Sequence, residues 1–499
     1  MKSIFTKQIL DPFLFSLRNF PDKNCFHINE KFYTYEEFSK SISKIRTSLE
    51  HQKINPNVGL VVNDDIETYA SIFAIWLEGL AYVPLHPLQP LKRNKEIIDQ
   101  ADIDLILVSN ELFGYEEFNT IVTCKLEFDK LKLKPKLVND DSLAYILFTS
   151  GSTGNPKGVQ ISRNNIGSFM KSFWETGIII SENDKCLQCF DLTFDVSIQS
   201  YLTPLTRGSC AYTVPHNEIK YSYVFGLLDD HELTFGAMPP SMIRLLRPYF
   251  EEINISSMRY NILTAEASPL ELITEWASCI PNAEIYNFYG PTEATIYCSY
   301  NKFYRNKKNK QVNGMFSIGK IMSGINSIVI DKKNNILKTG IKGELAVSGS
   351  QITKGYWQNK IKNKESFFNK KINGVSHRFY KTGDSCYFDF DGDIMLFGRL
   401  DNQVKIQGYR IELGELEYHA REVLGGGNTV AIVVENNIGN NEIIMFIEEE
   451  DSNKVKKVSE YLKQKLPLYM IPKEIKLITP FPINNSGKVD RQKLKNMAQ

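Results

Sequence analysis

The stretch LAYILFTSGSTGNPKG, residues 143–158, joins a strand-like run to a loop of glycine and hydroxyl residues. Residues 143–148 form a short apolar run, which is typical of a buried strand. The loop that follows lets backbone N–H groups and hydroxyls surround phosphate oxygens, and Lys157 adds a positive charge. The segment therefore predicts a phosphate-binding loop at the end of a strand.

Strand-like and helix-like segments alternate before this loop. Residues 58–62 and 104–109 are short apolar runs, whereas residues 66–80 are apolar nearly all round and long enough for a buried helix. A succession of strand, helix and strand is typical of parallel α/β layers. We therefore predict an α/β fold in which sheets and helices form layers.

The last part of the chain predicts a separate, smaller unit. Apolar residues recur at helical spacing in residues 412–424 and 454–466. Two strand-like segments, residues 429–436 and 442–450, lie between them. We place the boundary in the polar stretch at Asp401. Residues 1–400 are then the N-terminal core, and residues 401–499 are a small α+β lid.

Composition and charge limit the class of protein. The 499 residues are 42% apolar and 23% charged, as in ordinary globular chains, and the formal net charge of +1 gives no basic field for nucleic acid. Eight cysteines are too few for a disulfide scaffold. No apolar run is long and uncharged enough to span a membrane. We expect a cytoplasmic protein that binds neither nucleic acid nor membrane.

Further motifs follow the loop, and together they resemble those of the adenylate-forming superfamily, which includes acyl-CoA synthetases, luciferases and amino-acid adenylation enzymes. They occur in that family's order over nearly the whole chain: FTSGSTGNPKG (148–158), FD (194–195), NFYGPTE (287–293), GEL (343–345), GYW (355–357), YKTGD (380–384), GRLD (398–401), KIQGYRIE (405–412), LPLYMIP (466–472) and NSGKVDR (485–491). The chain is most similar to adenylation domains of the nonribosomal-peptide type, including stand-alone D-alanine–carrier-protein ligases.

The resemblance implies that ATP is bound by residues from three of these motifs. Asn287 and Tyr289 would hold the adenine, through an amide hydrogen bond and ring stacking. Asp384 is short and anionic and would bind both ribose hydroxyls, with Arg399 assisting it.

The resemblance also implies a set of residues for the phosphates and the metal. Thr292 and Glu293 would position phosphate and Mg²⁺, a hard cation that prefers oxygen ligands. Lys488 on the lid would stabilise charge in the transition state. The phosphate loop would contribute Thr149, Ser150, Gly151, Ser152, Thr153, Gly154 and Lys157, of which Thr149 and Lys157 act with Lys488 in catalysis.

Asp195 indicates the class of substrate. It matches the aspartate that pairs with the substrate α-ammonium in amino-acid-activating members, a charge-assisted contact. Phe194 matches the aromatic residue that gates the thiol tunnel. The implied pocket lining carries no charge, and the bulk of Phe288 and Tyr297 would shorten the cavity, so we expect a small or medium neutral amino acid. The Asp-Val-x-x-Gln pattern from Asp195, with isoleucine further on, resembles proline-activating pockets, which makes proline the leading candidate. The lining is Val196, Gln199, Ala237, Ile262, Thr264, Phe288, Ile296 and Tyr297.

The lid is implied to move and to meet a second protein. Family members rotate this domain after adenylation, which places a hinge at Asp401 and would bring residues 405–412 to the active site. Gly408 would line the tunnel for the phosphopantetheine arm of a separate carrier protein. Residues 452–499 hold eleven Lys and Arg against three Asp and Glu, which predicts a surface that attracts an acidic carrier. Because the last motif ends near the end of the chain, we expect a stand-alone enzyme.

Two alternatives stay open, an acyl- or aryl-CoA synthetase and a non-catalytic binding protein. Asp195 argues against the first, because an acid without an amine has no use for it. The second is disfavoured because Lys157, Glu293, Asp384 and Lys488 are all present.

His86 stands where the family usually has aspartate and is predicted to be structural. Asp191, four positions before Asp195, is the less favoured match to the ammonium-binding aspartate.

Overall fold

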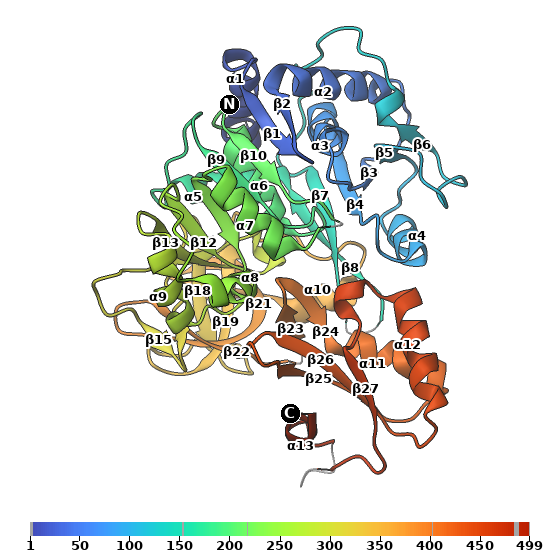
Figure 1. Ribbon diagram of the computed structural model, residues 1–499, viewed down its shortest axis with the longest axis vertical. Helices are drawn as coiled ribbons and strands as arrows, with labels where there is room; N and C mark the ends of the chain where they lie inside the picture. The colour runs from blue at the N-terminus through green and yellow to red at the C-terminus, as the bar shows by residue number, and fades with distance from the viewer. Residues whose placement is uncertain (1–2, 152–153, 217, 402, 484–488, 499) are drawn as a thin grey trace. The chain divides into compact units, whose positions relative to one another are not determined.

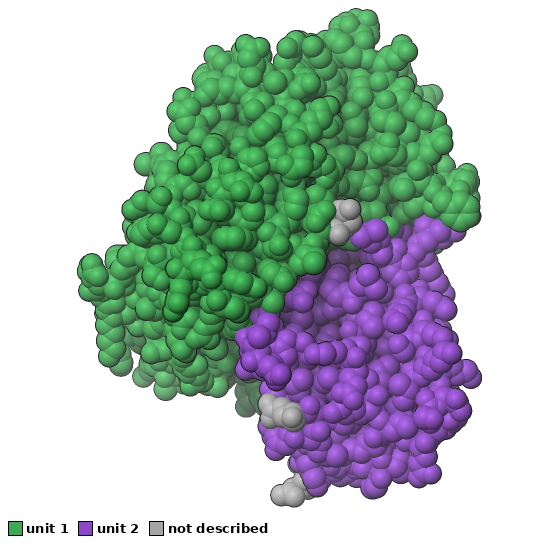
Figure 2. Space-filling view, viewed as in Figure 1, with its two compact units in different colours: residues 1–87, 98–147, 158–400 green, residues 88–97, 148–157, 401–499 purple. Residues whose placement is uncertain are grey.

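The computed structural model describes residues 3–151, 154–216, 218–401, 403–483 and 489–498. The chain divides into two compact units, coloured separately in Figure 2. Unit 1 comprises residues 1–87, 98–147 and 158–400, and unit 2 comprises residues 88–97, 148–157 and 401–499. Unit 2 thus combines the C-terminal part with two short segments from much earlier in the sequence.

The first layer of the α/β fold is a six-stranded sheet. Its strand order is β6-β5-β3-β4-β7-β8, with bounds Thr120–Val122, Ile106–Val108, Asn57–Val61, Ala81–Leu85, Leu143–Thr149 and Lys157–Ser162. The helix α3 (Ile66–Glu78) connects the parallel strands β3 and β4. Its N-terminus is capped by the Asp65 side chain, which accepts a hydrogen bond from the Thr68 N–H at 2.8 Å, and it ends at Gly79 with φ +86°.

A nine-stranded sheet forms the second layer of unit 1. Its order is β17-β14-β13-β12-β11-β9-β10-β1-β2, with bounds Lys320–Ile321, Ser299–Lys302, Glu284–Tyr289, Tyr260–Leu263, Phe235–Met238, Lys185–Gln188, Cys210–Thr213, Asn24–Ile28 and Lys31–Thr34. The strands from β1 to β13 in this order are parallel, so their carboxyl ends lie at one edge. Helices α2 (Tyr35–Glu50), α3, α5 (Arg163–Trp174) and α6 (Asp195–Leu205) share one apolar core with both sheets.

A five-stranded antiparallel sheet completes unit 1. It contains β18 (Ile325–Ile330), β19 (Gly343–Gly349), β20 (Phe367–Ile372), β21 (Val375–Phe388) and β22 (Ile394–Arg399). The remaining α-helices outside residues 401–499 are α1 (Asp11–Asn19), α4 (Leu91–Gln100), α7 (Lys220–Asp230), α8 (Pro240–Leu246), α9 (Leu270–Cys279) and α10 (Lys360–Ser366).

In unit 2, a hairpin of β23 (Gln403–Ile406) and β24 (Tyr409–Glu412) leads into a small α+β layer (Figure 1). The layer consists of α11 (Leu413–Leu424), β25 (Thr429–Glu435), β26 (Asn441–Ile447), α12 (Asn453–Lys465), β27 (Glu474–Leu477) and α13 (Arg491–Ala498). Apolar side chains of α11 and α12 pack against β25 and β26 around Leu416 and Leu462, both fully buried.

The predicted fold class is confirmed, because the protein is α/β with layered sheets and carries a small C-terminal α+β part. The strands and helices predicted at 58–62, 66–80, 104–109, 143–148 and in the last hundred residues are present with boundaries that differ by a few positions. The hairpin, β27 and α13 were not predicted. In the described part of the chain, no helix combines the length and apolarity needed to cross a membrane.

Candidate active site

The predicted phosphate loop lies in unit 2, and its glycines are required by close packing. A Cβ atom on Gly151 would lie 2.0 Å from the carbonyl oxygen of Asn155. Gly154 has φ +87°, and a Cβ there would lie 2.4 Å from a ring carbon of Tyr418. The Thr149 hydroxyl donates to the carbonyl oxygen of Lys157 at 3.5 Å, which joins the two ends of the loop. Ser152 and Thr153 lie outside the described residues.

The donors of this loop hold carboxylate oxygens from α11 and the residue before it. The Lys157 ammonium lies 3.1 Å from Oε1 of Glu412, and the two side chains are only 8% and 14% exposed. The Gly151 N–H donates to Oε2 of Glu415 at 3.2 Å. A lysine and a backbone N–H that bind anionic oxygens are the donor set that a phosphate needs. The loop residues therefore fit the phosphates of ATP.

Further contacts fix these two glutamates. The Ser150 hydroxyl donates to the carbonyl oxygen of Arg410 at 2.9 Å and accepts from the Glu412 N–H at 3.1 Å. Arg93 of α4 donates to Oε1 of Glu415 at 2.7 Å, and this ion pair is buried, with 5% and 0% of the side chains exposed. Neither Arg93 nor Glu415 was predicted, because no motif marks them and they are 322 positions apart.

The residues implied to bind ribose come together on the five-stranded sheet. Asp384 on β21 and Arg399 on β22 are directly opposite each other, and the arginine donates to Oδ1 at 3.2 Å. The Tyr289 hydroxyl donates to Oδ2 of Asp384 at 2.5 Å. Burial and the adjacent Asp384 charge raise the pKa of Tyr289 well above its usual range, so the phenol stays protonated. The carboxylate is thereby held in one orientation from both sides.

The Asn287 side chain is held in place by three contacts within the protein. Its amide donates to the carbonyl oxygens of Ser317 at 3.1 Å and Phe316 at 3.4 Å, and its oxygen accepts from the Ser268 hydroxyl at 3.0 Å. The residue is 3% exposed. The amide therefore joins loops at the end of β13, and its implied contact with adenine stays a prediction.

Glu293 offers a buried carboxylate for the implied Mg²⁺. It lies in the turn Thr292–Ala294, is 0% exposed, and accepts a hydrogen bond at Oε1 from the Tyr356 hydroxyl at 2.7 Å. The Thr353 N–H fixes its backbone carbonyl at 2.9 Å. A positioned carboxylate oxygen suits a hard cation, so this residue fits a magnesium ligand. Thr292 is half-buried in the same turn.

Asp195 begins α6 directly after Phe194, so its carboxylate lies at the positive end of the helix dipole. It is 8% exposed. Burial raises the pKa of Tyr82, Tyr145 and Tyr297, and the charge of Asp195 raises it further. Asp195 is therefore close enough to three neutral phenols to act on them electrostatically.

Tyr82 and Tyr145 were missed by sequence reasoning, because they belong to strands β4 and β7, far from the FD motif in the sequence. The buried hydroxyl of Tyr145 makes no hydrogen bond to any described residue. A phenol of this kind next to Asp195 is a further polar group for a substrate. The only sequence signal was an aromatic residue within an apolar strand.

The structure buries the whole predicted pocket lining, each residue being at most 6% exposed: Val196, Gln199, Ala237, Ile262, Thr264, Phe288, Ile296 and Tyr297. Ala237 and Ile262 are paired on the parallel strands β11 and β12. The rings of Phe288 and Tyr297 lie 5.0 Å apart, and the Tyr297 hydroxyl donates to Oε1 of Gln199 at 3.5 Å. The side chains thus form one apolar and aromatic cluster with few polar groups.

Three predicted residues belong to the lid. Asp401 accepts a hydrogen bond from the Gln403 N–H at 3.2 Å. Gly408 has φ +83° in the β23–β24 turn, a conformation that favours glycine for backbone reasons alone. Lys488 lies outside the described residues. The hinge and tunnel roles stay predictions.

Comparison with known proteins identifies the family. The sequence profile of the AMP-binding enzymes matches residues 14–357. The chain belongs to the AMP-binding enzyme family. The predicted resemblance to adenylate-forming enzymes is thereby confirmed.

Curated proteins with similar sequences include two synthases. A linear gramicidin synthase of Brevibacillus parabrevis is 29% identical over 95% of this chain, which spans only 9% of that protein. Zwittermicin A synthase ZmaJ of Bacillus cereus is 29% identical over 95% of this chain and 92% of its own length.

A solved structure shares the fold. The Vibrio cholerae adenylation domain AlmE, determined in complex with glycyl-adenosine-5'-phosphate, aligns with a TM-score of 0.87 and 22% identity, covering 100% of this chain and 99% of AlmE.

Proposed function

We propose that this enzyme activates a small or medium neutral amino acid with ATP and transfers it to the phosphopantetheine thiol of a separate carrier protein. Family membership supports adenylate formation. The observation that carries the amino-acid class is Asp195, a buried carboxylate at the start of α6 among neutral aromatic side chains. A buried carboxylate at this place offers a charge-assisted hydrogen bond to a substrate ammonium.

The reaction uses these residues to bind and orient. Asp195 accepts the substrate ammonium, which directs the substrate carboxylate toward the α-phosphorus of ATP. A carboxylate oxygen bonds to that phosphorus while the bond to the bridging oxygen breaks and pyrophosphate leaves, so no general base is needed. Lys157 and the Gly151 N–H stabilise phosphate charge. Glu293 would hold Mg²⁺, which neutralises phosphate charge when bound.

In the second step, the carrier thiolate attacks the acyl carbon, the thioester bond forms, and AMP leaves. The structure of PA1221, described as a protein containing adenylation and carrier (PCP) domains, has the same fold with a TM-score of 0.86. That likeness supports a carrier protein as the acceptor.

The pocket lining supports a neutral side chain on the substrate. Among its described residues, Gln199 and Thr264 are the polar members besides the Tyr297 hydroxyl, and none is charged. Gln199 also donates to the Thr203 hydroxyl at 2.9 Å, which holds its amide within α6. Proline is the leading candidate within this class, because Asp195, Val196 and Gln199 resemble the start of a proline-activating pocket.

ATP–pyrophosphate exchange with a panel of L- and D-amino acids tests the proposal. We expect exchange with one or a few neutral amino acids and none with charged ones. Exchange that depends on fatty or aromatic acids without an amine would instead establish an acyl- or aryl-CoA synthetase. Background exchange with every acid would exclude adenylation.

Glu412 and ATP should compete for Lys157. Replacing Glu412 by glutamine keeps the side-chain size but removes the charge that lies 3.1 Å from the lysine. We expect the Kd for ATP, measured by calorimetry, to fall about 3- to 10-fold, which is roughly 0.7–1.4 kcal/mol. Glu417→Gln is the matched control, because this carboxylate pairs with Arg491 instead. Unchanged or weaker ATP binding in Glu412→Gln would contradict the competition.

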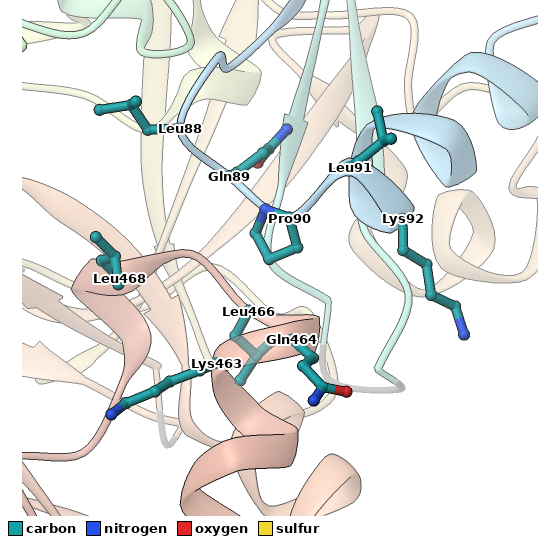
Figure 3. A pocket seen from close by; sticks show the side chains of 9 residues that line it. All are labelled: Leu88, Gln89, Pro90, Leu91, Lys92, Lys463, Gln464, Leu466 and Leu468. Carbon is teal, nitrogen blue, oxygen red and sulfur yellow. The ribbon is translucent and has the colours of Figure 1, made fainter. Parts of the chain in front are cut away.

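A hollow of about 370 Å³ in unit 2 suits an acidic, partly apolar partner (Figure 3). Exposed Leu88 and Leu468 line it together with Lys92 and Lys463. Lys465 lowers the pKa of Lys92, since like charges are crowded there. Charge complementarity therefore favours the proposed carrier as its occupant.

Reversing two of these charges should weaken carrier loading. For Lys92→Glu with Lys463→Glu, we expect the apparent KM for the carrier to rise about 5- to 20-fold at low ionic strength, with exchange unchanged. The same reversal at the exposed Lys332 and Lys333 of unit 1 is the control. Equal KM values for both double variants would exclude docking at the hollow.

A further inference from the structure

Four loops of unit 1 bring together two histidines and two aspartates that the reaction does not use. Asp64 follows β3 and His86 follows β4, which are parallel neighbours in the six-stranded sheet. Asp191 follows β9 and His216 follows β10, which are parallel neighbours in the nine-stranded sheet. All four residues lie past the carboxyl ends of their strands, where α/β folds commonly bind ligands.

The donor atoms are close enough to share one ion. Within the described residues, one nitrogen from each of His86 and His216 and one oxygen of Asp191 lie within 4.8 Å of one another. Nδ1 of His216 lies 3.7 Å from Oδ1 of Asp191 and 3.2 Å from Oδ2 of Asp64. Ligand atoms around a tetrahedral zinc ion, with bonds of about 2.1 Å, are roughly 3.4 Å apart. The 3.7 Å between His216 and Asp191, two of the proposed ligands, is close to that value.

The orientation of His216 also suits a metal ligand. Its Nε2 lies 3.2 Å from the carbonyl oxygen of Val62, so an Nε2–H donates to this acceptor. Metal-binding histidines commonly donate their second ring N–H in this way, which fixes the tautomer. Nδ1 then faces the carboxylates of Asp64 and Asp191, so an ion between these groups would meet one nitrogen and two carboxylate donors.

We propose that His86, Asp191 and His216 bind a divalent transition-metal ion of the zinc class, with Asp64 adding negative charge. Two imidazoles and a carboxylate are a donor set that zinc accepts, with a further position for water. Lys220 lies 3.2 Å from Oδ1 of Asp191, so the ion would have to replace its ammonium as the partner of that oxygen. This gives a chemical role to Asp191 and to His86, of which the sequence predicts His86 to be structural.

The site is linked to the start of α6. The carbonyl oxygen of Asp191 accepts a hydrogen bond from the Phe194 N–H at 2.8 Å, and Asp195 is the next residue. An ion on Asp191 would therefore fix the turn that presents Asp195. Resting on the proposed function, this predicts that the ion lowers the KM for the amino acid and leaves the KM for ATP unchanged.

Direct metal binding tests the site without ATP or amino acid, so its outcome is separate from that of the proposed function. The full chain is treated with a chelator, dialysed, and titrated with Co²⁺ and then Zn²⁺. We expect one equivalent of Co²⁺ with the visible absorption of a site with nitrogen and oxygen ligands, and its displacement by Zn²⁺. His216→Ala should weaken binding more than about 100-fold, because even indirect partners of a metal contribute 10–100-fold.

Two other histidine variants complete the experiment. His86→Asn should lose binding like His216→Ala, and it replaces that variant if circular dichroism shows His216→Ala to be unfolded. His231→Ala belongs to the other histidine cluster, formed with His27 and Glu30, and should bind as the unaltered protein does. Absence of stoichiometric binding, binding that survives both ligand variants, or binding lost in His231→Ala would overturn the proposal.

Discussion

Asp195→Ala is expected to abolish amino-acid-dependent pyrophosphate exchange while ATP still binds. The substrate ammonium would enter a buried aromatic pocket without its counter-charge, and loss of one partner of a buried ion pair costs about 3–5 kcal/mol. This corresponds to a decrease in kcat/KM of roughly one hundred- to several thousand-fold. Exchange assays measure the loss, and calorimetry with ATP measures the retained binding.

Two companion variants make this result specific. Asp195→Asn keeps the shape and removes only the charge, so its loss should approach that of the alanine variant. Asp229→Ala removes an exposed carboxylate near the end of α7 and should leave exchange unchanged. Undiminished exchange in Asp195→Ala would exclude an amino-acid substrate bound through this residue.

Lys488→Ala is expected to reduce adenylation by about 10²–10³, the value of one preorganised donor to developing charge. Transfer from a supplied aminoacyl-adenylate to the carrier should stay within a few-fold of normal, because the implied role of this lysine ends when pyrophosphate leaves. Single-turnover assays of each half-reaction measure the two effects. Lys493→Ala on the exposed side of α13 controls for loss of a nearby positive charge. An equal loss in both steps would contradict a role confined to adenylation.

Local patterns predicted the elements whose residues carry their own signal. The helix α3 is apolar on all faces and has a capping aspartate and a terminal glycine, so its position follows from a short window of sequence. The phosphate loop likewise has glycines whose packing requires them. Asp384 and Arg399 could be predicted to act together because each belongs to a motif of the family, although the pairing of their strands is visible only in the structure.

Contacts between distant segments were not predictable in the same way. The Asn287 amide is used by backbone carbonyls 29 and 30 positions away, and no motif reveals that its donors are already satisfied. Tyr145 enters the surroundings of Asp195 from a strand whose sequence suggests only burial. The histidine and aspartate cluster arises from four strand ends in two sheets, an arrangement that depends on strand order.

The buried ion pair between Arg93 and Glu415 has a consequence for recombination of this chain with its relatives. A chimera that takes residues 401–499 from a relative without a carboxylate at position 415 would keep Arg93 but lose its partner, and an unpaired buried guanidinium would destabilise unit 2 by several kcal/mol. A crossover at residue 400 is therefore thermodynamically neutral only when the donor also has a carboxylate at position 415. Otherwise the exchanged block must include residues 88–97 and 148–157, so this unit is inherited as three pieces of sequence and not one.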